Sequence, residues 1–255
     1  MSKPLIVAHR GDTQNAPENT LPAFANAIKK GADGIELDVH LTQDSQLVVH
    51  HYFGLGTTTS GSGLLFEKTL AEIKQADAGS WFSSAFSGVQ VPTLAEVFDL
   101  GKGKVRFEID LKGSSLRFLQ AVIREIERFG IEADVELTTA HYALLHHAKQ
   151  INPGLQTGTF FNPPPDWMAL RLAQRHVIDW ATLFDIQVAH VNRVLITEEF
   201  VEELHQHNLL VHGSNLSTGE EIEQGLAMGI DRFSTDHIEL ALQLRNEFVR
   251  RKTRA

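Results

Sequence analysis

Short apolar segments alternate with helical patterns along almost the whole chain, and this alternation restricts the possible folds more than any other feature. We predict eight strands, at Leu5–His9, Gly34–His40, Val105–Lys112, Val135–Thr139, Gln156–Phe160, Ile186–His190, Leu209–Gly213 and Arg232–Thr235. Strands joined by helices pair in parallel, and eight such units in 255 residues match a TIM-type (β/α)₈ barrel of the α/β class. An open doubly wound sheet is the alternative, but the number of strands and the polar residues at their ends favour the closed barrel.

The helical patterns between the strands complete the repeat. They lie at Leu21–Lys30, Leu94–Leu100, Leu116–Phe129, Tyr142–Gln150, Trp167–Val177, Glu198–His207, Gly219–Met228 and about Glu239–Arg250. The segment from about residue 52 to residue 92 breaks this rhythm, because it is rich in Gly, Ser and Thr and holds one short helical pattern, Leu70–Gln75. We predict a single domain over residues 1–255 with a small insertion after the second strand. Long insertions of this kind are usually functional loops.

Composition narrows the classes of function. The chain has no cysteine, which excludes disulfides and thiolate metal sites, and its formal net charge of -9 disfavours a nucleic-acid partner. No stretch approaches the roughly 20 apolar residues of a membrane helix, and the first ten residues do not resemble a signal peptide. We therefore predict a soluble, cytoplasmic protein without stable membrane association.

Two predicted strands carry acidic residues at every second position. Because side chains alternate between the two faces of a strand, one face of Gly34–His40 and one face of Val105–Lys112 are polar. These faces hold Glu36, Asp38 and His40 on the first strand and Arg106, Glu108, Asp110 and Lys112 on the second. Solvated faces would give the same pattern, but strands in a β/α repeat are covered on both sides. Buried carboxylates must be paired or must bind a cation.

The carboxylates predict a site for a hard cation. Glu36 and Asp38 can bind one ion from the same strand, and Asp110 or Glu108 can supply the third ligand. Ligand oxygens without sulfur suit Mg²⁺ or Ca²⁺, and three carboxylates serve either ion. Lys112 would then offset the charge of a bound phosphate group.

Histidines at strand ends are candidates for proton transfer. His9 ends the first predicted strand, and His50 and His51 follow the apolar segment Leu47–Val49. Two histidines beside a phosphate group can serve as general acid and general base. Arg10 can bind phosphate oxygens through its fork of donors. Nucleotide-binding glycine loops and the G-x-S-x-G nucleophile motif are absent from the sequence.

These pieces, in this order, resemble the glycerophosphodiester phosphodiesterase family. The matching segments are His9–Gly11, Pro17–Thr20, Gly31–Val39, Val48–His51, Thr58–Gly61, Gly79–Phe82, Val91–Val97, Ile109–Lys112 and Gly229–Asp236. The resemblance implies a TIM barrel that hydrolyses glycerophosphodiesters, the deacylated phospholipid headgroups, to glycerol 3-phosphate and an alcohol. It also implies a divalent cation, Mg²⁺ or Ca²⁺.

The resemblance assigns roles to individual residues. His9 and His51 take the general acid and general base positions, and Arg10 and Lys112 take the phosphate-binding positions. Glu36 and Asp38 take two of the metal positions, and the third falls on Asp110, with Glu108 as the alternative.

Four positions depart from the family pattern. Asp110 replaces the usual Glu, Tyr52 replaces the Asp that follows the second histidine, and His212 replaces a Trp expected in the substrate wall. In the closing motif, His237 follows Thr235-Asp236 where the family has TDxP. His50 would be the catalytic histidine if the register were shifted by one, but His51 keeps the spacing to the Thr58–Gly61 segment.

Two alternative functions stay open on the sequence alone. One is another phosphodiester-cleaving barrel similar to sphingomyelinase D, whose metal ligands can include Asp. The other is a catalytically inactive barrel that binds a phosphodiester, which the departures from the family pattern suggest.

Overall fold

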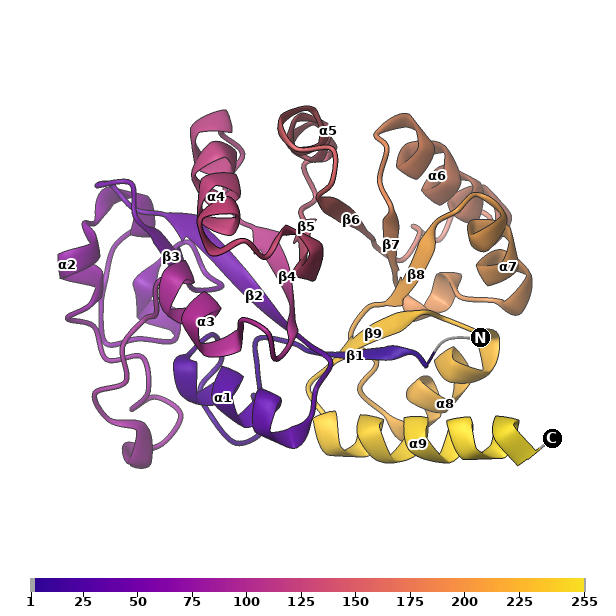
Figure 1. The fold of residues 1–255 in the computed structure, drawn as a ribbon, viewed down its shortest axis with the longest axis horizontal. Helices are drawn as coiled ribbons and strands as arrows, with labels where there is room; N and C mark the ends of the chain where they lie inside the picture. The colour runs from indigo at the N-terminus through magenta and orange to yellow at the C-terminus, as the bar shows by residue number, and fades with distance from the viewer. Residues whose placement is uncertain (1–2, 255) are drawn as a thin grey trace.

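The chain forms a closed barrel, as the sequence predicts. A computed structural model describes residues 3–254, with side chains from residue 3 to residue 252. Its barrel strands are β1 (Leu5–Ala8), β2 (Gly34–Leu41), β4 (Arg106–Leu111), β5 (Val135–Thr138), β6 (Gln156–Phe161), β7 (Val188–Val191), β8 (Leu210–Gly213) and β9 (Arg232–Thr235). All neighbouring barrel strands pair in parallel, and β1 pairs with both β2 and β9, which closes the sheet (Figure 1). The open doubly wound sheet is therefore excluded.

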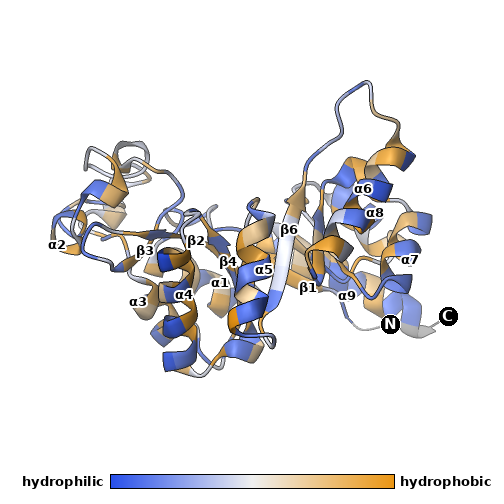
Figure 2. Cartoon of the chain, turned by 90° about the horizontal axis from the view of Figure 1, so that it is seen from above, coloured by the Kyte–Doolittle hydropathy of each residue, from blue (hydrophilic) through white to orange (hydrophobic). Residues whose placement is uncertain are grey.

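Helices surround the barrel (Figure 1). They are α1 (Leu21–Lys30), α3 (Leu94–Gly101), α4 (Leu116–Phe129), α5 (Tyr142–Ile151), α6 (Leu170–Leu183), α7 (Glu198–Gln206), α8 (Gly219–Met228) and α9 (Ile238–Arg254). Figure 2 shows hydrophobic and hydrophilic residues mixed along each of them, as expected for helices that face a core on one side and solvent on the other. None of the helices within residues 3–254 has the length and apolar character that a membrane span requires.

The bounds of helix α6 differ from the sequence-based prediction. The pattern suggested Trp167–Val177, whereas α6 runs from Leu170 to Leu183. The backbone before it forms a turn in which Met168 donates to the carbonyl of Pro165, and Ala169 is extended. The proline-rich loop therefore delays the start of the helix.

The insertion builds a small layer beside the barrel. A short strand, β3 (Leu47–Val49), pairs antiparallel with β2. The next segment holds three short 3₁₀ helices, at Leu55–Thr57, Leu65–Glu67 and Ser84–Phe86, and the helix α2 (Leu70–Ile73). They enclose their own apolar cluster, formed by Val48, Leu55, Leu65, Ile73, Ala78 and Val91. In Figure 1 this layer lies next to α3, on one side of the barrel.

The two faces of each barrel strand have opposite character. On β2 and β4 the side chains that pack against the helices are Ile35, Leu37, Val39, Phe107, Ile109 and Leu111. The alternate positions face the barrel interior, and the strand register sets Glu36 opposite Glu108 and Asp38 opposite Asp110. Glu36, Asp38 and Glu108 are buried, so the acidic faces are inside the barrel and not in solvent, as predicted.

Candidate active site

A cavity of about 380 Å³ opens at the carboxyl ends of the barrel strands, where TIM barrels place their active sites. The residues to which the family resemblance assigns a role all line it: His9, Arg10, Glu36, Asp38, His51, Glu108, Asp110 and Lys112. The opposite wall comes from residues that the sequence reading did not single out, among them Phe160, Phe161, Asn192 and Asn215.

Three carboxylates meet at one side of this cavity. Oxygen atoms of Glu36, Asp38 and Asp110 lie within 4.8 Å of one another. Burial and the neighbouring charge of Asp38 raise the pKa of Glu36 to about 8, and burial also raises the pKa of Asp110. Carboxylates held this closely need a cation, and an all-oxygen set fits Mg²⁺ or Ca²⁺. Glu108 lies outside this group, although it lines the same cavity.

Lys112 lies against two of these carboxylates. Its Nζ is 2.8 Å from Asp38 Oδ1 and 2.6 Å from Asp110 Oδ2. Burial favours the neutral amine, but the charges of Asp38 and Asp110 outweigh it, so the pKa of Lys112 is raised and the side chain stays protonated. Burial also acts to raise the pKa of Asp38, yet the hydrogen bond from His51 and the charge of Lys112 lower it well below its usual range.

Arg10 enters the cavity from a strained turn. Its φ of 54° is left-handed, and its backbone N–H donates to Glu36 Oε2 at 2.9 Å. A Cβ at the next residue, Gly11, would lie 2.8 Å from atoms of Ala23, so glycine is required there. The Arg10 guanidinium reaches Glu18 Oε1 at 3.2 Å, and its Nε, 3.4 Å from Asp38 Oδ2, is buried without a hydrogen bond.

Each candidate catalytic histidine is held by a carboxylate through Nδ1. The Nδ1 of His9 is 3.0 Å from Asp236 Oδ1, which also accepts a hydrogen bond from Thr13. The Nδ1 of His51 is 3.1 Å from Asp38 Oδ1. If each Nδ1–H donates to its carboxylate, both Nε2 atoms carry a lone pair toward the cavity. The Nε2 of His51 then accepts a hydrogen bond from Nη2 of Arg10, at 3.3 Å. Burial tends to lower the pKa of His9, but the hydrogen bond to Asp236 and the charges of Glu36 and Asp236 together raise it.

The structure distinguishes the two adjacent histidines after β3. His51 lines the cavity, whereas His50 is buried and its Nε2 lies 3.3 Å from the carbonyl oxygen of Gly54. This geometry supports the register in which His51 faces the substrate.

Two of the departures from the family pattern now have a structural explanation. Tyr52 occupies the place of the expected Asp, but Asp38 already holds His51, and the Tyr52 ring packs edge-on against that histidine at 4.8 Å. His212 was expected near the substrate wall and is instead completely buried within the barrel. Ser214 and Asn215, which follow it, line the cavity.

Asp236 belongs to the closing motif of the sequence, but its role is apparent only in the structure. The residue follows β9 directly and lies 227 positions from His9 in the chain. Its position at the carboxyl end of a barrel strand was the available signal, because acidic residues at this end of a TIM barrel usually serve the site.

The chain is similar to glycerophosphodiester phosphodiesterases over nearly its whole length. The model of the glycerophosphoryl diester phosphodiesterase family matches residues 9–240. A glycerophosphodiester phosphodiesterase of Caldanaerobacter subterraneus is 33% identical over 249 residues, which cover 95% of this chain and 98% of the relative. A glycerophosphodiester phosphodiesterase of Bacillus altitudinis is 31% identical over 251 residues, which cover 95% of this chain and 98% of that protein.

Solved structures share the fold at lower identity. A phosphodiesterase of Oleispira antarctica, in complex with the product sn-glycerol-3-phosphate, superposes with a TM-score of 0.84 at 23% identity, covering 95% of this chain and 97% of that one. A glycerophosphodiester phosphodiesterase of Agrobacterium tumefaciens gives a TM-score of 0.83 at 23% identity, covering 94% and 99% of the two chains.

Proposed function

Since the chain belongs to the glycerophosphoryl diester phosphodiesterase family, we propose how its own residues carry out the family's reaction. The protein is a phosphoric diester hydrolase that cleaves glycerophosphodiesters to glycerol 3-phosphate and an alcohol. The observation that carries the residue assignment is the meeting of two carboxylate-held histidines, two cationic side chains and three carboxylates in one cavity.

The two histidines divide the proton transfers. His9 and His51 reach the cavity from different strands, each held through Nδ1. One Nε2 accepts the proton of the attacking hydroxyl group or water, and the other, protonated, donates to the alkoxide that leaves. If the attacking oxygen is the glycerol 2-hydroxyl, the product is a cyclic phosphate. The two histidines then exchange roles when water opens the ring.

The cationic side chains bind the phosphate group. Arg10 and Lys112 present a guanidinium and an ammonium group to the cavity, and both remain charged because neighbouring carboxylates raise the pKa of each above its usual value. We assign both to the phosphodiester oxygens, where they stabilise the charge that develops in the transition state.

Glu36, Asp38 and Asp110 are the proposed ligands of one divalent cation, Mg²⁺ or Ca²⁺. Such an ion would supply Lewis-acid stabilisation of phosphoryl oxygens. The residues fit this role because they are all oxygen donors, are held close together and are largely buried.

The test is release of glycerol 3-phosphate from glycerophosphocholine and glycerophosphoethanolamine, with Mg²⁺, Ca²⁺ or EDTA. Metal-dependent release that is lost by orders of magnitude in His9→Ala and in His51→Ala, with both variants folded, would support the assignment. Near-normal turnover in either variant would contradict its role. Turnover that persists after exhaustive chelation would contradict the cation site.

Three further assignments are proposals from the composition. We propose that residues 1–255 act as one domain, that the protein works in the cytoplasm, and that it has no nucleic-acid partner. The absence of cysteine and the net charge of -9 support the last two. Cell fractionation and a filter-binding assay would test them.

A further inference from the structure

Below the cavity, the barrel interior holds a second group of polar side chains that the proposed mechanism does not use. We call it the deep cluster, and it consists of Glu108, Glu136, His190, His212 and Arg232, which come from five different strands. Each is at most 5% exposed. Glu108 precedes Asp110 by two residues on β4, which places it about 6.6 Å further back along the strand, away from the mouth of the barrel. The interiors of TIM barrels are more often filled by branched apolar side chains.

Two members of the deep cluster have unmet hydrogen-bonding capacity. Within the described side chains, neither ring nitrogen of His212 has a hydrogen-bond partner, and neither has Glu108 Oε2. The two groups are only 3.3 Å apart, from His212 Nδ1 to Glu108 Oε2, but their alignment does not make a hydrogen bond. Leaving buried polar atoms unpaired destabilises a fold. A cation bound by these two atoms would satisfy Nδ1 of His212 and Oε2 of Glu108.

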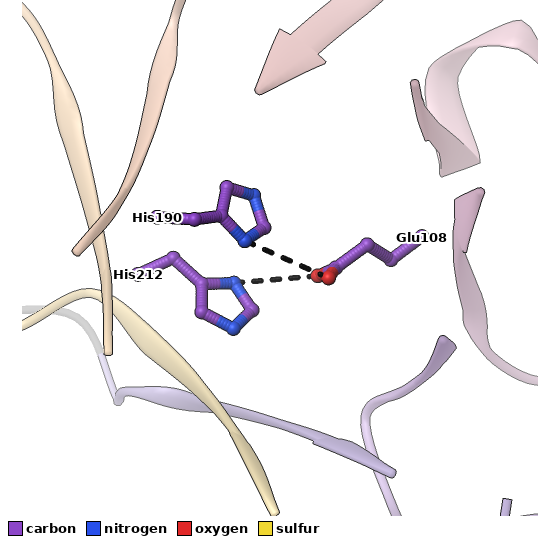
Figure 3. A group of neighbouring side chains, drawn as sticks. All are labelled: Glu108, His190 and His212. Carbon is purple, nitrogen blue, oxygen red and sulfur yellow. Dashed lines mark ion pairs between the residues drawn. The ribbon is translucent and has the colours of Figure 1, made fainter. Parts of the chain in front are cut away.

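The hydrogen bonds on one side of His190 leave its other ring nitrogen available to bind a metal ion. Its Nε2 lies 2.6 Å from Glu136 Oε1, and the other oxygen of Glu136 accepts a hydrogen bond from Arg232. A carboxylate on the outer nitrogen fixes the tautomer and leaves the lone pair of Nδ1 free, which is the usual arrangement around metal-bound histidine. That Nδ1 lies 3.6 Å from Glu108 Oε1, and Figure 3 shows both histidine rings with a nitrogen directed at the Glu108 carboxylate.

A glycine makes room for this arrangement. A Cβ at Gly158, on β6, would lie 2.1 Å from Glu136 Oε1 and 2.6 Å from His190 Nε2. Any side chain at this position would therefore displace the Glu136–His190 pair. Glycine inside a strand often marks such a close approach.

We propose that Glu108, His190 and His212 bind a divalent transition metal ion of the Zn²⁺ type. Their donor atoms lie within 4.8 Å of one another. Each imidazole Nδ1 faces a different oxygen of the Glu108 carboxylate, His212 at 3.3 Å from Oε2 and His190 at 3.6 Å from Oε1. Both separations are close to the value of about 3.4 Å between two ligands of a tetrahedral ion with bonds near 2.1 Å. Two imidazoles and one carboxylate form an established zinc ligand set.

The deep cluster differs in chemistry from the carboxylate site above it. Nitrogen ligands favour Zn²⁺ and related ions, whereas the all-oxygen group of Glu36, Asp38 and Asp110 suits Mg²⁺ or Ca²⁺. Glu108 lines the floor of the cavity, which gives an ion a way in. The deep ion would offset the charge of Glu108 beneath the site and hold the floor in place, without contact with the substrate.

The experiment measures metal retention, not turnover. Chelator-treated protein is incubated with one equivalent of Zn²⁺ in a large excess of Mg²⁺ and desalted into the same Mg²⁺ buffer, and bound zinc is measured by atomic emission. We expect about one zinc per chain for the wild type and for the control Glu36→Gln, which removes a carboxylate ligand from the upper site. Retention should fall at least tenfold in His212→Phe and in Glu108→Gln.

Two results would overturn the proposal: no zinc retained by the wild type, or equal retention in the wild type and the deep-cluster variants. Glu108→Gln preserves the size of the side chain, so it remains informative if His212→Phe does not fold, as judged by circular dichroism. Zinc should also raise the Tm of the wild type and of Glu36→Gln by several degrees and leave the deep-cluster variants unchanged. Zinc retention does not depend on phosphodiesterase activity, so this test and the turnover test can fail independently.

Discussion

Asp236→Asn removes the charge that holds His9 while preserving the shape of the side chain. In the wild type, Asp236 Oδ1 lies 3.0 Å from Nδ1 of His9 and also accepts a hydrogen bond from Thr13. An asparagine can still accept a hydrogen bond, but it can also rotate and offer its NH₂ group, which would stabilise the wrong tautomer of the imidazole. The variant therefore tests whether Asp236 acts through the orientation and charge of His9.

The expected loss in kcat/KM follows from the kind of hydrogen bond that the substitution removes. A hydrogen bond to a charged group contributes about 1.5–3 kcal/mol, which corresponds to roughly 10- to 150-fold in kcat/KM. The side chain of Asp236 is 34% exposed and that of His9 20%, so solvent screens part of the interaction. We therefore expect a loss in the lower half of this range, roughly 10- to 50-fold.

The assay is the pH profile of kcat/KM for glycerophosphocholine hydrolysis. Since Asp236 raises the pKa of His9 above its ordinary value, its neutralisation should lower that pKa, and the limb of the profile that reports His9 should move to lower pH. Asp231→Asn is the matched control, because Asp231 pairs with His205 at 2.9 Å outside the cavity. Its kcat/KM should match the wild type. A profile for Asp236→Asn that is unshifted, with kcat/KM within threefold of the wild type, would refute the reasoning.

Three other sets of substitutions test separate parts of the structure. His51→Ala should lower kcat, measured by product release, by roughly 10²- to 10⁴-fold. His50→Ala should lower kcat less than tenfold in folded protein, because Nε2 of His50 contacts the carbonyl of Gly54 and the ring does not line the cavity. Equal losses in the two variants would refute the assignment of His51 as the catalytic histidine. Gly158→Ala should lower the free energy of unfolding by at least about 2 kcal/mol in urea denaturation, because the new methyl would lie 2.1 Å from a buried carboxylate oxygen. The control Gly219→Ala, with its nearest neighbour at 3.7 Å, should change stability by less than about 1 kcal/mol, and similar losses in both would argue against the close approach. Tyr52→Asp should not raise kcat/KM more than threefold, since a carboxylate already holds the adjacent histidine; a larger gain would show that this histidine is poorly oriented in the wild type.

Much of the candidate site could be located from local sequence patterns. The alternation of polar and apolar residues in Gly34–His40 and Val105–Lys112 directs the carboxylates to one face of each strand, whatever the rest of the fold. Parallel pairing then brings the ends of the strands together, so His9 and Lys112 were expected in one cavity and are found there. The start of α6 was predicted wrongly, because the helical pattern of the sequence extends into residues that form a turn after the proline-rich loop.

The partners across the barrel could not be read from the sequence. Asp236 meets His9 because β1 pairs with β9 and closes the barrel. In the sequence Tyr52 stands where the family has an Asp after this histidine, yet Asp38 reaches His51 from β2. Such contacts depend on closure and register, which are properties of the whole sheet.

The sequence by itself determined the barrel, its inward-facing acids and the histidines at its mouth, because the period of two along a strand and the strand–helix repeat are local signals. Only the tertiary structure decided which side chains meet in the interior. Glu108 lies on β4, whereas His190 and His212 lie on the paired strands β7 and β8, so the carboxylate and the two rings come within reach of one ion only when the barrel closes. Distance in space across a closed sheet is set by strand order and register, and a linear pattern does not encode it.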